Sequence, residues 1–279
     1  GYLYGMYRKI RNEFTGVLTG KGLSYGGSLI RPEATGYGQV YFAREMLKTR
    51  ELNLEGKVCL VSGSGNVAQF AAEKVLQLGG IVITMSDSGG FIHDPNGITF
   101  EKLEWIKELK NVRRGRISEY ANNFEGAIYT PVDHNLDYNP LWAVDADIAL
   151  PAATQNEING LDAKNLLSNN VYVVSEGSNM PCTPEAIDHF IEAGILYAPG
   201  KASNAGGVAT SGLEMSQNSM RMNWTRDEVD EKLDAIMVSI HETCARTAEE
   251  YGFPGNYMMG ANIAGFLKVA DAMLNQGII

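Results

Sequence analysis

The sequence predicts an α/β fold in which a doubly wound sheet is followed by a helical C-terminal region. Short apolar runs bounded by glycine alternate with stretches of helical periodicity as far as Pro199, an alternation typical of parallel strands joined by helices. A glycine-rich turn joins the first run to the helical stretch after it. Beyond about Ser203 only helical patterns remain. We therefore expect a sheet with helices on both faces and an α-helical tail.

The first predicted elements precede the sheet. From Tyr2 to Phe14 the apolar residues recur at helical spacing, and a glycine-rich stretch from Gly16 to Gly27 ends the pattern. Pro32 and Glu33 then open a second helix that is expected to run to about Arg50. Proline suits a first helical position, and an acidic residue suits the positive end of the helix dipole. The sequence thus predicts a helix, a loop and a second helix before the first strand.

Predicted strands and helices alternate in the middle of the chain. Residues 57–62, Lys-Val-Cys-Leu-Val-Ser, form a short apolar run between two glycines, which is typical of a buried parallel strand. Helices are expected over residues 66–78 and from the capping residue Thr99 to about Lys110, with a turn at Asp94-Pro-Asn-Gly between them. Further strands are predicted over residues 81–85, 127–130, 148–150, 171–175 and 195–198. In the tail, a capping box at Thr225-Arg-Asp-Glu opens a helix, and a final helix is predicted over residues 257–275.

Composition narrows the class of partner. The net charge is -10 and the pI is about 5.0, whereas nucleic acids and anionic membranes select basic faces. The three cysteines, Cys59, Cys182 and Cys244, lack the paired spacings of a metal site or a disulfide framework. No apolar run approaches the roughly 20 residues that span a bilayer. We expect a cytoplasmic protein that binds a small molecule and neither nucleic acid nor membrane.

The glycine turn after the first strand predicts a phosphate site. In Ser62-Gly63-Ser64-Gly65-Asn66-Val67-Ala68, the first glycine permits a tight turn and the second lets the backbone approach a pyrophosphate. The following helix N-terminus offers free N–H groups to the anion. An ordinary strand-to-helix turn is the alternative interpretation. The strand before it, the helix after it and a second strand ending in Asp87 favour a Rossmann-type dinucleotide site.

The residues alone leave the choice of cofactor open. An acidic residue at the end of the second strand hydrogen-bonds a ribose 2'-hydroxyl, so Asp87, between Ser86 and Ser88, favours NAD. A basic cluster one helix further on favours a 2'-phosphate, although it could equally be a solvated helix end. That cluster consists of Lys110, Arg113, Arg114 and Arg116.

Several motifs in order along the chain resemble those of the hexameric glutamate dehydrogenases, most closely the small-subunit bacterial type. The motifs are Arg31-Pro-Glu-Ala-Thr35-Gly-Tyr-Gly, Ser64-Gly-Asn-Val-Ala, Pro151-Ala-Ala-Thr-Gln-Asn-Glu, Glu176-Gly-Ser-Asn-Met-Pro and Ser203-Asn-Ala-Gly-Gly-Val-Ala-Thr-Ser211-Gly. The resemblance covers the whole chain. It implies three parts: residues 1–30 as a remnant of a substrate domain and its junction, 31–255 as the dinucleotide-binding domain, and 256–279 as a helix that packs on the substrate domain.

The resemblance also implies roles for matching positions. Ser64, Asn66 and Val67 would hold the pyrophosphate beside Gly63 and Gly65. The nicotinamide end would be contacted by Thr35, Asn179 and Asn204, with Arg31 bracing that wall, and the adenosine half by Ala153, Thr154 and Gln155. Ser86, Lys110 and Arg113 would receive a 2'-phosphate, which favours NADP over NAD despite Asp87. Ser211 matches the serine that hydrogen-bonds the substrate α-carboxylate, with Val208 lining the pocket. Individually, such residues could equally be turn formers or helix-end hydroxyls.

The proton chemistry of this family is not expected from these residues. The resemblance places it on a glycine-rich lysine motif and an aspartate of the substrate domain, and the sequence contains no such lysine motif. Lys21 belongs to a different motif. The four histidines, His93, His134, His189 and His241, have no partnered nucleophile, and we predict neither a catalytic residue nor a metal site. A chain that opens at Gly1 inside a helical pattern is expected to be a fragment that binds NADP, turns over no glutamate and self-associates through apolar terminal helices.

The favoured hypothesis is the cofactor domain of an NADP-dependent glutamate dehydrogenase that acts on L-glutamate and 2-oxoglutarate and forms a homo-oligomer, a hexamer, at full length. A second hypothesis is a stand-alone nucleotide-binding or regulatory module without chemistry. A third keeps the enzyme class and changes the substrate to another amino acid. The Glu214-Met-Ser-Gln-Asn-Ser stretch favours glutamate.

Overall fold

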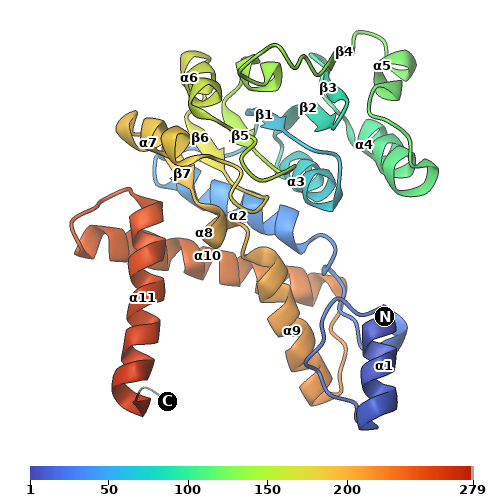
Figure 1. Cartoon of the computed structure of the whole chain (residues 1–279), viewed down its shortest axis with the longest axis vertical. Coiled ribbons are helices and arrows are strands. Elements are labelled where there is room, and N and C mark those ends of the chain that lie inside the picture. The colour runs from blue at the N-terminus through green and yellow to red at the C-terminus, as the bar shows by residue number, and fades with distance from the viewer. Residues whose placement is uncertain (278–279) are drawn as a thin grey trace.

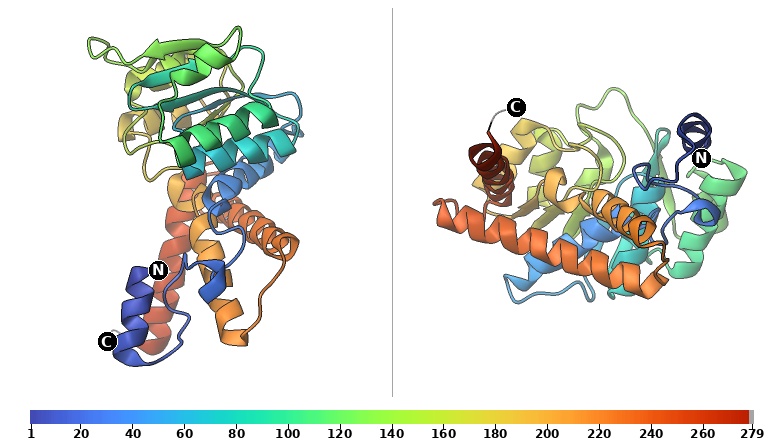
Figure 2. Two further views of the ribbon diagram at one scale, coloured as in Figure 1. Left: turned by 90° about the vertical axis from the view of Figure 1, so that its right-hand side faces the viewer. Right: turned by 90° about the horizontal axis from the view of Figure 1, so that it is seen from below.

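The computed structural model describes residues 1–277 and shows a sheet flanked by helices, from which other helices extend to one side (Figure 1). The extending helices are α1 (Tyr2–Arg11), α9 (Gly206–Met220) and α11 (Tyr257–Gln276). The predicted final segment reaches residue 279, and its residues 278 and 279 lie outside the described part. Figure 2 shows that helices α1 and α11 lie on the same side of the sheet.

The sheet has seven strands in the order β4-β3-β2-β1-β5-β6-β7. From β2 to β7 through β1 all pairs are parallel, and the direction in which strands are added reverses between β1 and β5. This reversal is the switch point at which doubly wound folds bind ligands, and the predicted fold class is confirmed. The strands are β1 (Val58–Val61), β2 (Ile81–Asp87), β3 (Gly90–His93), β4 (Ile128–Pro131), β5 (Ile148–Leu150), β6 (Val173–Ser175) and β7 (Leu196–Ala198).

Strand β3 was not predicted. It pairs antiparallel with β2 and β4 and follows a tight turn in which Asp87 Oδ1 accepts the Gly89 N–H at 2.9 Å. Sequence reasoning treats adjacent glycines as a break, yet here they close a hairpin that brings Phe91 and Ile92 into the core. The sheet therefore gains a mixed edge beside β2.

Helices cover both faces of the sheet. One face packs against α2 (Ala34–Lys48), α3 (Asn66–Gln77) and α10 (Arg226–Glu250), and the other against α6 (Gly160–Ser168) and α7 (Pro184–Glu192). Side chains of a strand alternate between these faces: Cys59 and Val61 join the first core cluster and Leu60 the second. The remaining short elements are α4 (Phe100–Glu108), α5 (Glu119–Asn123), α8 (Gly200–Ser203), a π-helical turn at Leu109–Arg113, and 3-10 turns at Leu23–Tyr25 and Pro140–Ala143.

Close approach of helices depends on glycine at the crossing of α2 and α3. A Cβ on Gly36 would lie 2.5 Å from the Ala71 backbone nitrogen, so the helices could not stay at this separation with any other residue. The crossing sets where α2 meets the start of α3, and with it the wall of the switch-point crevice.

The helix ends follow the predicted signals only in part. Helix α2 begins at Ala34 with Glu33 as its N-cap, so Pro32 is not its first helical residue as predicted. Thr99 Oγ1 accepts the Lys102 N–H at 3.3 Å, and the capping box is present, with the Thr225 N–H donating to Glu228 Oε2 at 2.7 Å. Helix α1 ends at Arg11 and not at Phe14, because Asn12 adopts a left-handed conformation with φ of 53°. The predicted N-cap and capping box are confirmed, and the predicted end of the first helix is wrong.

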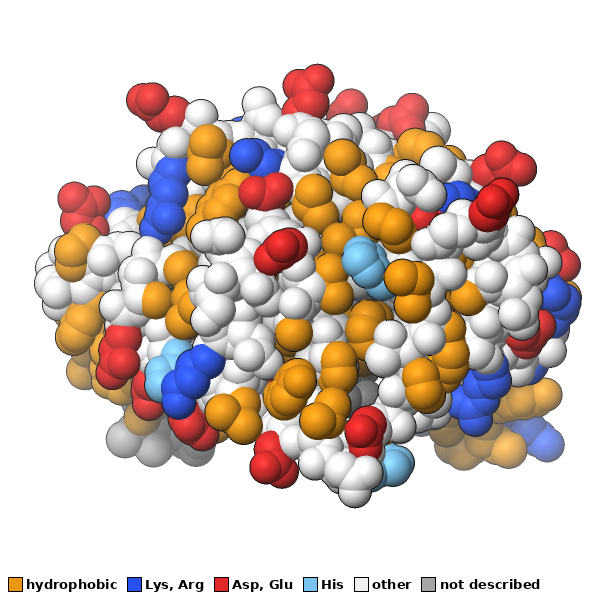
Figure 3. Space-filling view, turned by 90° about the horizontal axis from the view of Figure 1, so that it is seen from above, with side chains coloured by type: hydrophobic (Ala, Val, Ile, Leu, Met, Phe, Trp, Pro, Cys, Tyr) orange, Lys and Arg blue, Asp and Glu red, His pale blue; other side chains and the backbone are white. Residues whose placement is uncertain are grey.

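The lengths of the helices and the charges on the surface indicate which kinds of partner the protein can bind. Within residues 1–277, no helix is long and apolar enough to cross a membrane. On the face in Figure 3, acidic side chains ring a centre that carries many hydrophobic ones, and the basic side chains lie scattered. This face presents no continuous row of cations of the kind that phosphate backbones bind.

Candidate functional site

The glycine turn between β1 and α3 forms the floor of the candidate site. Gly63 has φ of 82°, and a Cβ there would lie 2.9 Å from the Ala152 carbonyl oxygen. Its N–H donates to Ser86 Oγ at 2.7 Å, and the Ser86 N–H donates to the Gly63 oxygen at 3.0 Å. These reciprocal bonds tie the turn to the end of β2.

The start of α3 is open. Among residues 1–277, no side chain caps its N-terminus at Gly65, and none lies within 4 Å of where a Gly65 Cβ would stand. The N–H groups of a first helical turn lack intrahelical acceptors and carry the positive end of the helix dipole. The arrangement therefore fits a phosphate group approaching the backbone.

A cavity of about 550 Å³ adjoins this turn. Its opposite wall is the loop after β5, and its end is the turn after β2. The geometry brings together nine of the predicted cofactor residues, namely Gly63, Ser64, Gly65, Asn66, Val67, Ser86, Asp87, Ala153 and Thr154. Segments from both sides of the switch point thus share one cavity.

Glu157, which sequence reasoning did not assign to the site, organises the loop after β5. Its Oε1 accepts the Ala153 N–H at 3.0 Å and the Thr154 N–H at 3.2 Å, and Ser178 Oγ lies 3.4 Å away. Burial raises the pKa of this carboxyl although those hydrogen bonds oppose the shift. Its place at the end of the Pro151 motif was the available signal. Gln155 of the same loop is exposed.

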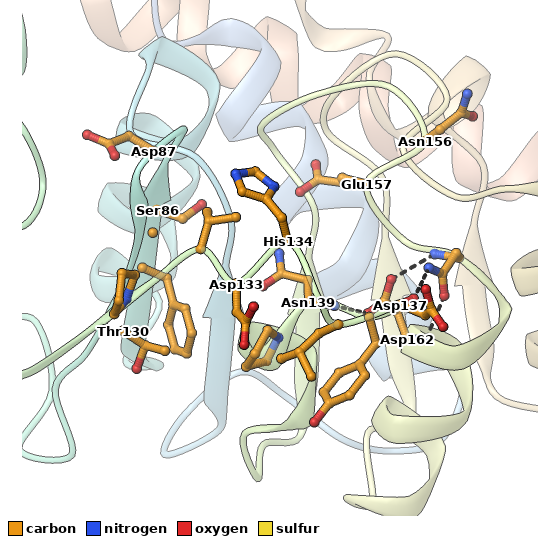
Figure 4. A pocket seen from close by; sticks show the side chains of 18 residues that line it. Ser86, Asp87, Thr130, Asp133, His134, Asp137, Asn139, Asn156, Glu157 and Asp162 are labelled. Atoms are coloured by element: carbon orange, nitrogen blue, oxygen red, sulfur yellow. Dashed lines mark hydrogen bonds between the residues drawn. The ribbon is translucent and has the colours of Figure 1, made fainter.

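A second cavity, of about 390 Å³, continues from the first past Ser86 and Glu157. Figure 4 shows His134 and Glu157 among its lining side chains, while the Asp87 carboxylate turns away from it. Asp162 closes the far end, where its Oδ1 accepts the Asn139 N–H at 2.7 Å. The loop after β4, which carries His134, therefore lines the second cavity, and sequence reasoning had assigned it no role.

Asp87 is committed to protein groups. Its Oδ2 pairs with Lys110 Nζ at 3.0 Å and accepts the Ile117 N–H at 2.9 Å. Burial alone would raise the pKa of Asp87, but these bonds and the Gly89 N–H outweigh it and hold the pKa below its usual value. Asp87 thus anchors the Lys110 ammonium at the end of β2.

The basic cluster divides into different environments. Arg116 donates from a guanidinium nitrogen to Ser88 Oγ at 2.8 Å, at the rim of the cavity. Arg113 lies 4.8 Å from the Trp105 ring centre and 3.7 Å from Glu108. The structure therefore places Arg116 against Ser88, which lines the cavity. Sequence reasoning had counted Arg116 in the basic cluster but had assigned neither residue to the site.

The nicotinamide end predicted from the motifs lies where α2 meets the segment after β6. Asn204 Nδ2 donates to the Gly177 carbonyl oxygen, and Thr35 Oγ1 would lie 2.6 Å from a Cβ on Gly207. Asn179 is exposed on the loop. The buried Glu176 accepts the Gly200 N–H at 2.6 Å and holds this loop against α8; burial raises its pKa.

Ser211 sits on α9 in a defined hydrogen-bond environment. It is 8% exposed, and its Oγ accepts from Arg31 Nε at 3.0 Å and from Thr19 Oγ1 at 3.1 Å. A hydroxyl oxygen has two lone pairs and one proton, so the proton of Ser211 is left to donate elsewhere. Val208 is 72% exposed, one turn earlier on the same helix. Ser211 is therefore prepared to donate to an anionic acceptor.

The remaining chemical candidates lie apart from these cavities. The buried His241 has Nε2 3.2 Å from Tyr257 Oη, and burial lowers its pKa. Cys59 is buried in β1, where burial raises the pKa of its thiol. Across residues 1–277, no group of three or more His, Cys, Asp and Glu side chains is placed to hold a metal ion.

Comparison with known proteins relates the chain to amino-acid dehydrogenases. The family model described as glutamate/leucine/phenylalanine/valine dehydrogenase matches residues 26–277. The chain is 58% identical over 279 residues to a glutamate dehydrogenase of Bacteroides thetaiotaomicron and 60% identical over 278 residues to an NAD(P)-specific glutamate dehydrogenase of Xylanibacter ruminicola. Both alignments cover 100% of this chain and 61% of the relative, so the chain spans less than two thirds of these proteins. An NADP-specific glutamate dehydrogenase of Helicobacter pylori is 55% identical over 279 residues and is covered to 62%.

Solved structures show the same relation. The glutamate dehydrogenase of Plasmodium falciparum superposes with a TM-score of 0.95 at 48% identity, covering 100% of this chain and 59% of that one. A hetero-hexameric glutamate dehydrogenase from Thermus thermophilus gives a TM-score of 0.80 at 25% identity, covering 98% and 60%. The similarity therefore extends over the sheet and over the helices that project from it.

Proposed function

Because the chain belongs to the glutamate/leucine/phenylalanine/valine dehydrogenase family, we propose that it is the cofactor-binding part of an NADP-dependent glutamate dehydrogenase. The reaction converts L-glutamate, NADP and water to 2-oxoglutarate, ammonia and NADPH. The carrying observation is the uncapped start of α3 at Gly65, which faces a cavity of about 550 Å³ at the switch point of the sheet. A bound nicotinamide cofactor would supply the acceptor for a hydride from the substrate α-carbon.

The chain's own residues bind and orient the two ligands. Backbone N–H groups of Ser64 to Val67 would donate to the pyrophosphate, and the loop at Ala153 and Thr154, which Glu157 holds, would border the adenosine half. Thr35, Asn179 and Asn204 contact the nicotinamide end. Ser211 would donate a hydrogen bond to a substrate carboxylate, and Arg31 holds that hydroxyl in place.

Preference for NADP is supported by the turn after β2. The Asp87 carboxylate is engaged by Lys110 and the Ile117 N–H, and it therefore brings a cation to the site where a free aspartate would repel phosphate. Ser88 and Arg116 add a hydroxyl and a guanidinium at the rim, and a guanidinium matches phosphate geometry. On this proposal Lys110, Arg116 and Ser88 form the 2'-phosphate end together with Ser86, and the predicted Arg113 would have to leave its place over Trp105 to join them.

We assign binding and not proton transfer to this chain. The residues given contain no glycine-rich lysine motif, and we place the proton-handling groups on the part of the family's length that the chain does not span. On this proposal residues 1–30 and 256–279 face that part, residues 31–255 bind the dinucleotide, and the full-length protein assembles as a homo-hexamer in the cytoplasm. The free thiols of Cys59, Cys182 and Cys244 support a reducing compartment.

Calorimetric titration of the chain with NADP and with NAD tests the cofactor assignment. We expect NADP to bind more tightly, by about tenfold or more, since a hydrogen bond to a charged group contributes about 1.5–3 kcal/mol. Arg116→Ala should weaken NADP and leave NAD unchanged, whereas the exposed Arg8→Ala should change neither. Tighter NAD binding would overturn the assignment, and absence of both would overturn the dinucleotide site. Turnover of glutamate against leucine, phenylalanine and valine by the longest natural gene product tests the substrate.

A further inference from the structure

An ion pair that the proposed chemistry does not use lies buried beside Ser211. Lys21 Nζ and Glu214 Oε1 are 2.7 Å apart, and their side chains are 2% and 0% exposed. Burying two charges costs free energy that only good geometry and further hydrogen bonds recover. A buried pair of this kind therefore needs an explanation beyond stability.

The Glu214 carboxylate holds a loop as well as a cation. It accepts the Gly20 N–H on Oε2 at 2.9 Å and the Lys21 N–H on Oε1 at 3.3 Å. The Lys21 ammonium donates in addition to the Leu18 carbonyl oxygen at 2.5 Å. Residues 18–21 are thus closed into a loop around one carboxylate, with the chain pinned on both sides of Thr19.

The pinned residue is the one that meets Ser211. Ser211 and Glu214 are three residues apart on α9 and so lie on the same helix face. Farther along that face, Gln217 Nε2 donates to Ser28 Oγ at 2.8 Å and Asn218 Nδ2 to the Gly26 oxygen at 2.8 Å. One face of α9 therefore grips the segment from Thr19 to Ser28, and Glu214 is the contact nearest to Ser211.

We propose that Glu214, together with Lys21, is a positioning residue for the substrate carboxylate. It does not reach the cavity itself. It fixes Thr19 so that Thr19 Oγ1 occupies one lone pair of Ser211 Oγ while Arg31 occupies the other, which leaves the Ser211 proton directed at the ligand. The inference rests on the proposed role of Ser211 and extends it to a buried pair that does not touch substrate.

Two variants distinguish the role of Glu214 as a hydrogen-bond acceptor from the role of the charges on Lys21 and Glu214. Glu214→Leu removes the acceptor of both backbone N–H groups and leaves the loop free. Lys21→Met with Glu214→Gln removes both charges and keeps an amide oxygen in the place of the carboxylate. Glu13→Gln, which removes one partner of the exposed pair between Arg11 and Glu13 at 3.7 Å, is the matched control on the same segment.

The measurements are the glutamate KM and kcat of the longest natural gene product, the NADP dissociation constant, and amide hydrogen exchange at Gly20 and Lys21. Glu214→Leu should raise KM by about tenfold or more, the factor expected for loss of a hydrogen bond to a charged group. NADP affinity should stay within about twofold in the same variant, because the cavity does not include α9. Exchange at both amides should accelerate. The double variant keeps one acceptor oxygen of the two that Glu214 uses, so it should raise KM by less than Glu214→Leu does. Glu13→Gln should keep KM near that of the parent.

Contradicting outcomes are distinct. If Glu214→Leu accelerates exchange but leaves KM unchanged, the loop does not position Ser211 and the inference fails. If KM rises while NADP affinity and the folded fraction both fall, Glu214 is structural only, and the inference fails as well. If the parent protein binds NADP but oxidises no glutamate, the proposed function itself fails.

Discussion

The sheet and the two terminal helices of this chain treat apolar side chains in opposite ways. In β1, β5, β6 and β7 nearly every residue is buried, with helices on both faces. In α1 only Tyr4 is buried, and in α11 only Tyr257 and Gly260. The apolar side chains that these helices expose are Tyr2, Leu3, Met6, Ile10, Phe266, Val269, Met273 and Leu274.

The difference shows which part of the chain buries its apolar side chains without help from another chain. The central strands and the helices against them bury their apolar side chains in two core clusters within the described chain. The exposed apolar residues of helices α1 and α11 do not stabilise the fold, because apolar side chains contribute to stability only when they are buried. The cofactor cavity lies in the sheet region, and Ser211 lies on α9, which extends toward the two terminal helices.

The largest difference in the free energy of unfolding is expected between two phenylalanine substitutions, one in each region. Phe190 on α7 is 0% exposed and Phe266 on α11 is 69% exposed. Phe190→Ala should lower the free energy of unfolding by about 3–5 kcal/mol, as for other large-to-small core substitutions. Phe266→Ala should stay within about 0.5 kcal/mol. Urea unfolding of both variants measures this, and equal losses would show that α11 is covered after all.

A smaller contrast lies inside the cofactor site, between two glycines of one turn. Gly63→Ala introduces a left-handed alanine, at about 1–2 kcal/mol, and a contact 2.9 Å from the Ala152 oxygen. It should reduce both stability and NADP affinity. Gly65→Ala has φ of -83° and open space, so the melting temperature should stay constant while NADP affinity falls about tenfold or more, because its methyl group displaces the pyrophosphate. Unchanged affinity in Gly65→Ala would remove the pyrophosphate from this turn.

The two regions also differ in how far the sequence predicted them. Strands in the sheet were predictable because a buried parallel strand is a continuous apolar run and its flanking glycines are unambiguous. The β3 hairpin was not, since adjacent glycines break and join strands equally well. The glycine turn was predictable because its chemistry is carried by backbone atoms in a fixed local order.

Contacts between distant segments could not be predicted. The pairing of Asp87 with Lys110, the bond from Arg116 to Ser88, and the hold of Glu157 on its loop depend on side chains that only the folded chain brings together. The position of Asp87 at the end of the second strand predicted a contact with the ribose. In the folded chain its carboxylate instead pairs with the Lys110 ammonium. Nine of the predicted cofactor residues line one cavity around the turn, while the contacts that their side chains make came from the fold.

A pH dependence is expected where the two regions join. His241 of α10 contacts Phe42 of α2 and Tyr257 of α11, and the charged groups around it are Glu45, Lys48 and Glu242. Burial lowers the pKa of His241 below the value of about 6.5 of a free imidazole. As pH falls through 6.5 the unfolded chain therefore binds a proton that the folded chain does not, and the free energy of unfolding decreases until the folded pKa is reached.

The measurement is thermal unfolding between pH 7.5 and pH 5, for the parent and for His241→Gln. The difference between the two proteins isolates this imidazole from Glu157, Asp162 and Glu176, whose raised pKa values act in the opposite direction. The free energy of unfolding that the parent loses between pH 7.5 and pH 5 through His241 should be smaller than the loss caused by Gly63→Ala. A parallel pH dependence in both proteins would assign the effect to other groups.

Substitutions on the exposed face of α11 should change the free energy of unfolding least and self-association most. Exposed contiguous apolar patches mark surfaces that bind other proteins, and α11 exposes Phe266 and Leu274. We expect the chain to self-associate, and Phe266→Glu with Leu274→Glu to make it monomeric in sedimentation velocity while the free energy of unfolding changes by less than about 0.5 kcal/mol per site. Phe100→Glu, at a half-exposed phenylalanine of α4 in the sheet region, is the matched control and should leave association unchanged. A parent chain that is monomeric over a wide concentration range would mean that the apolar face of α11 is inert, and the contrast between the two regions would then concern burial alone.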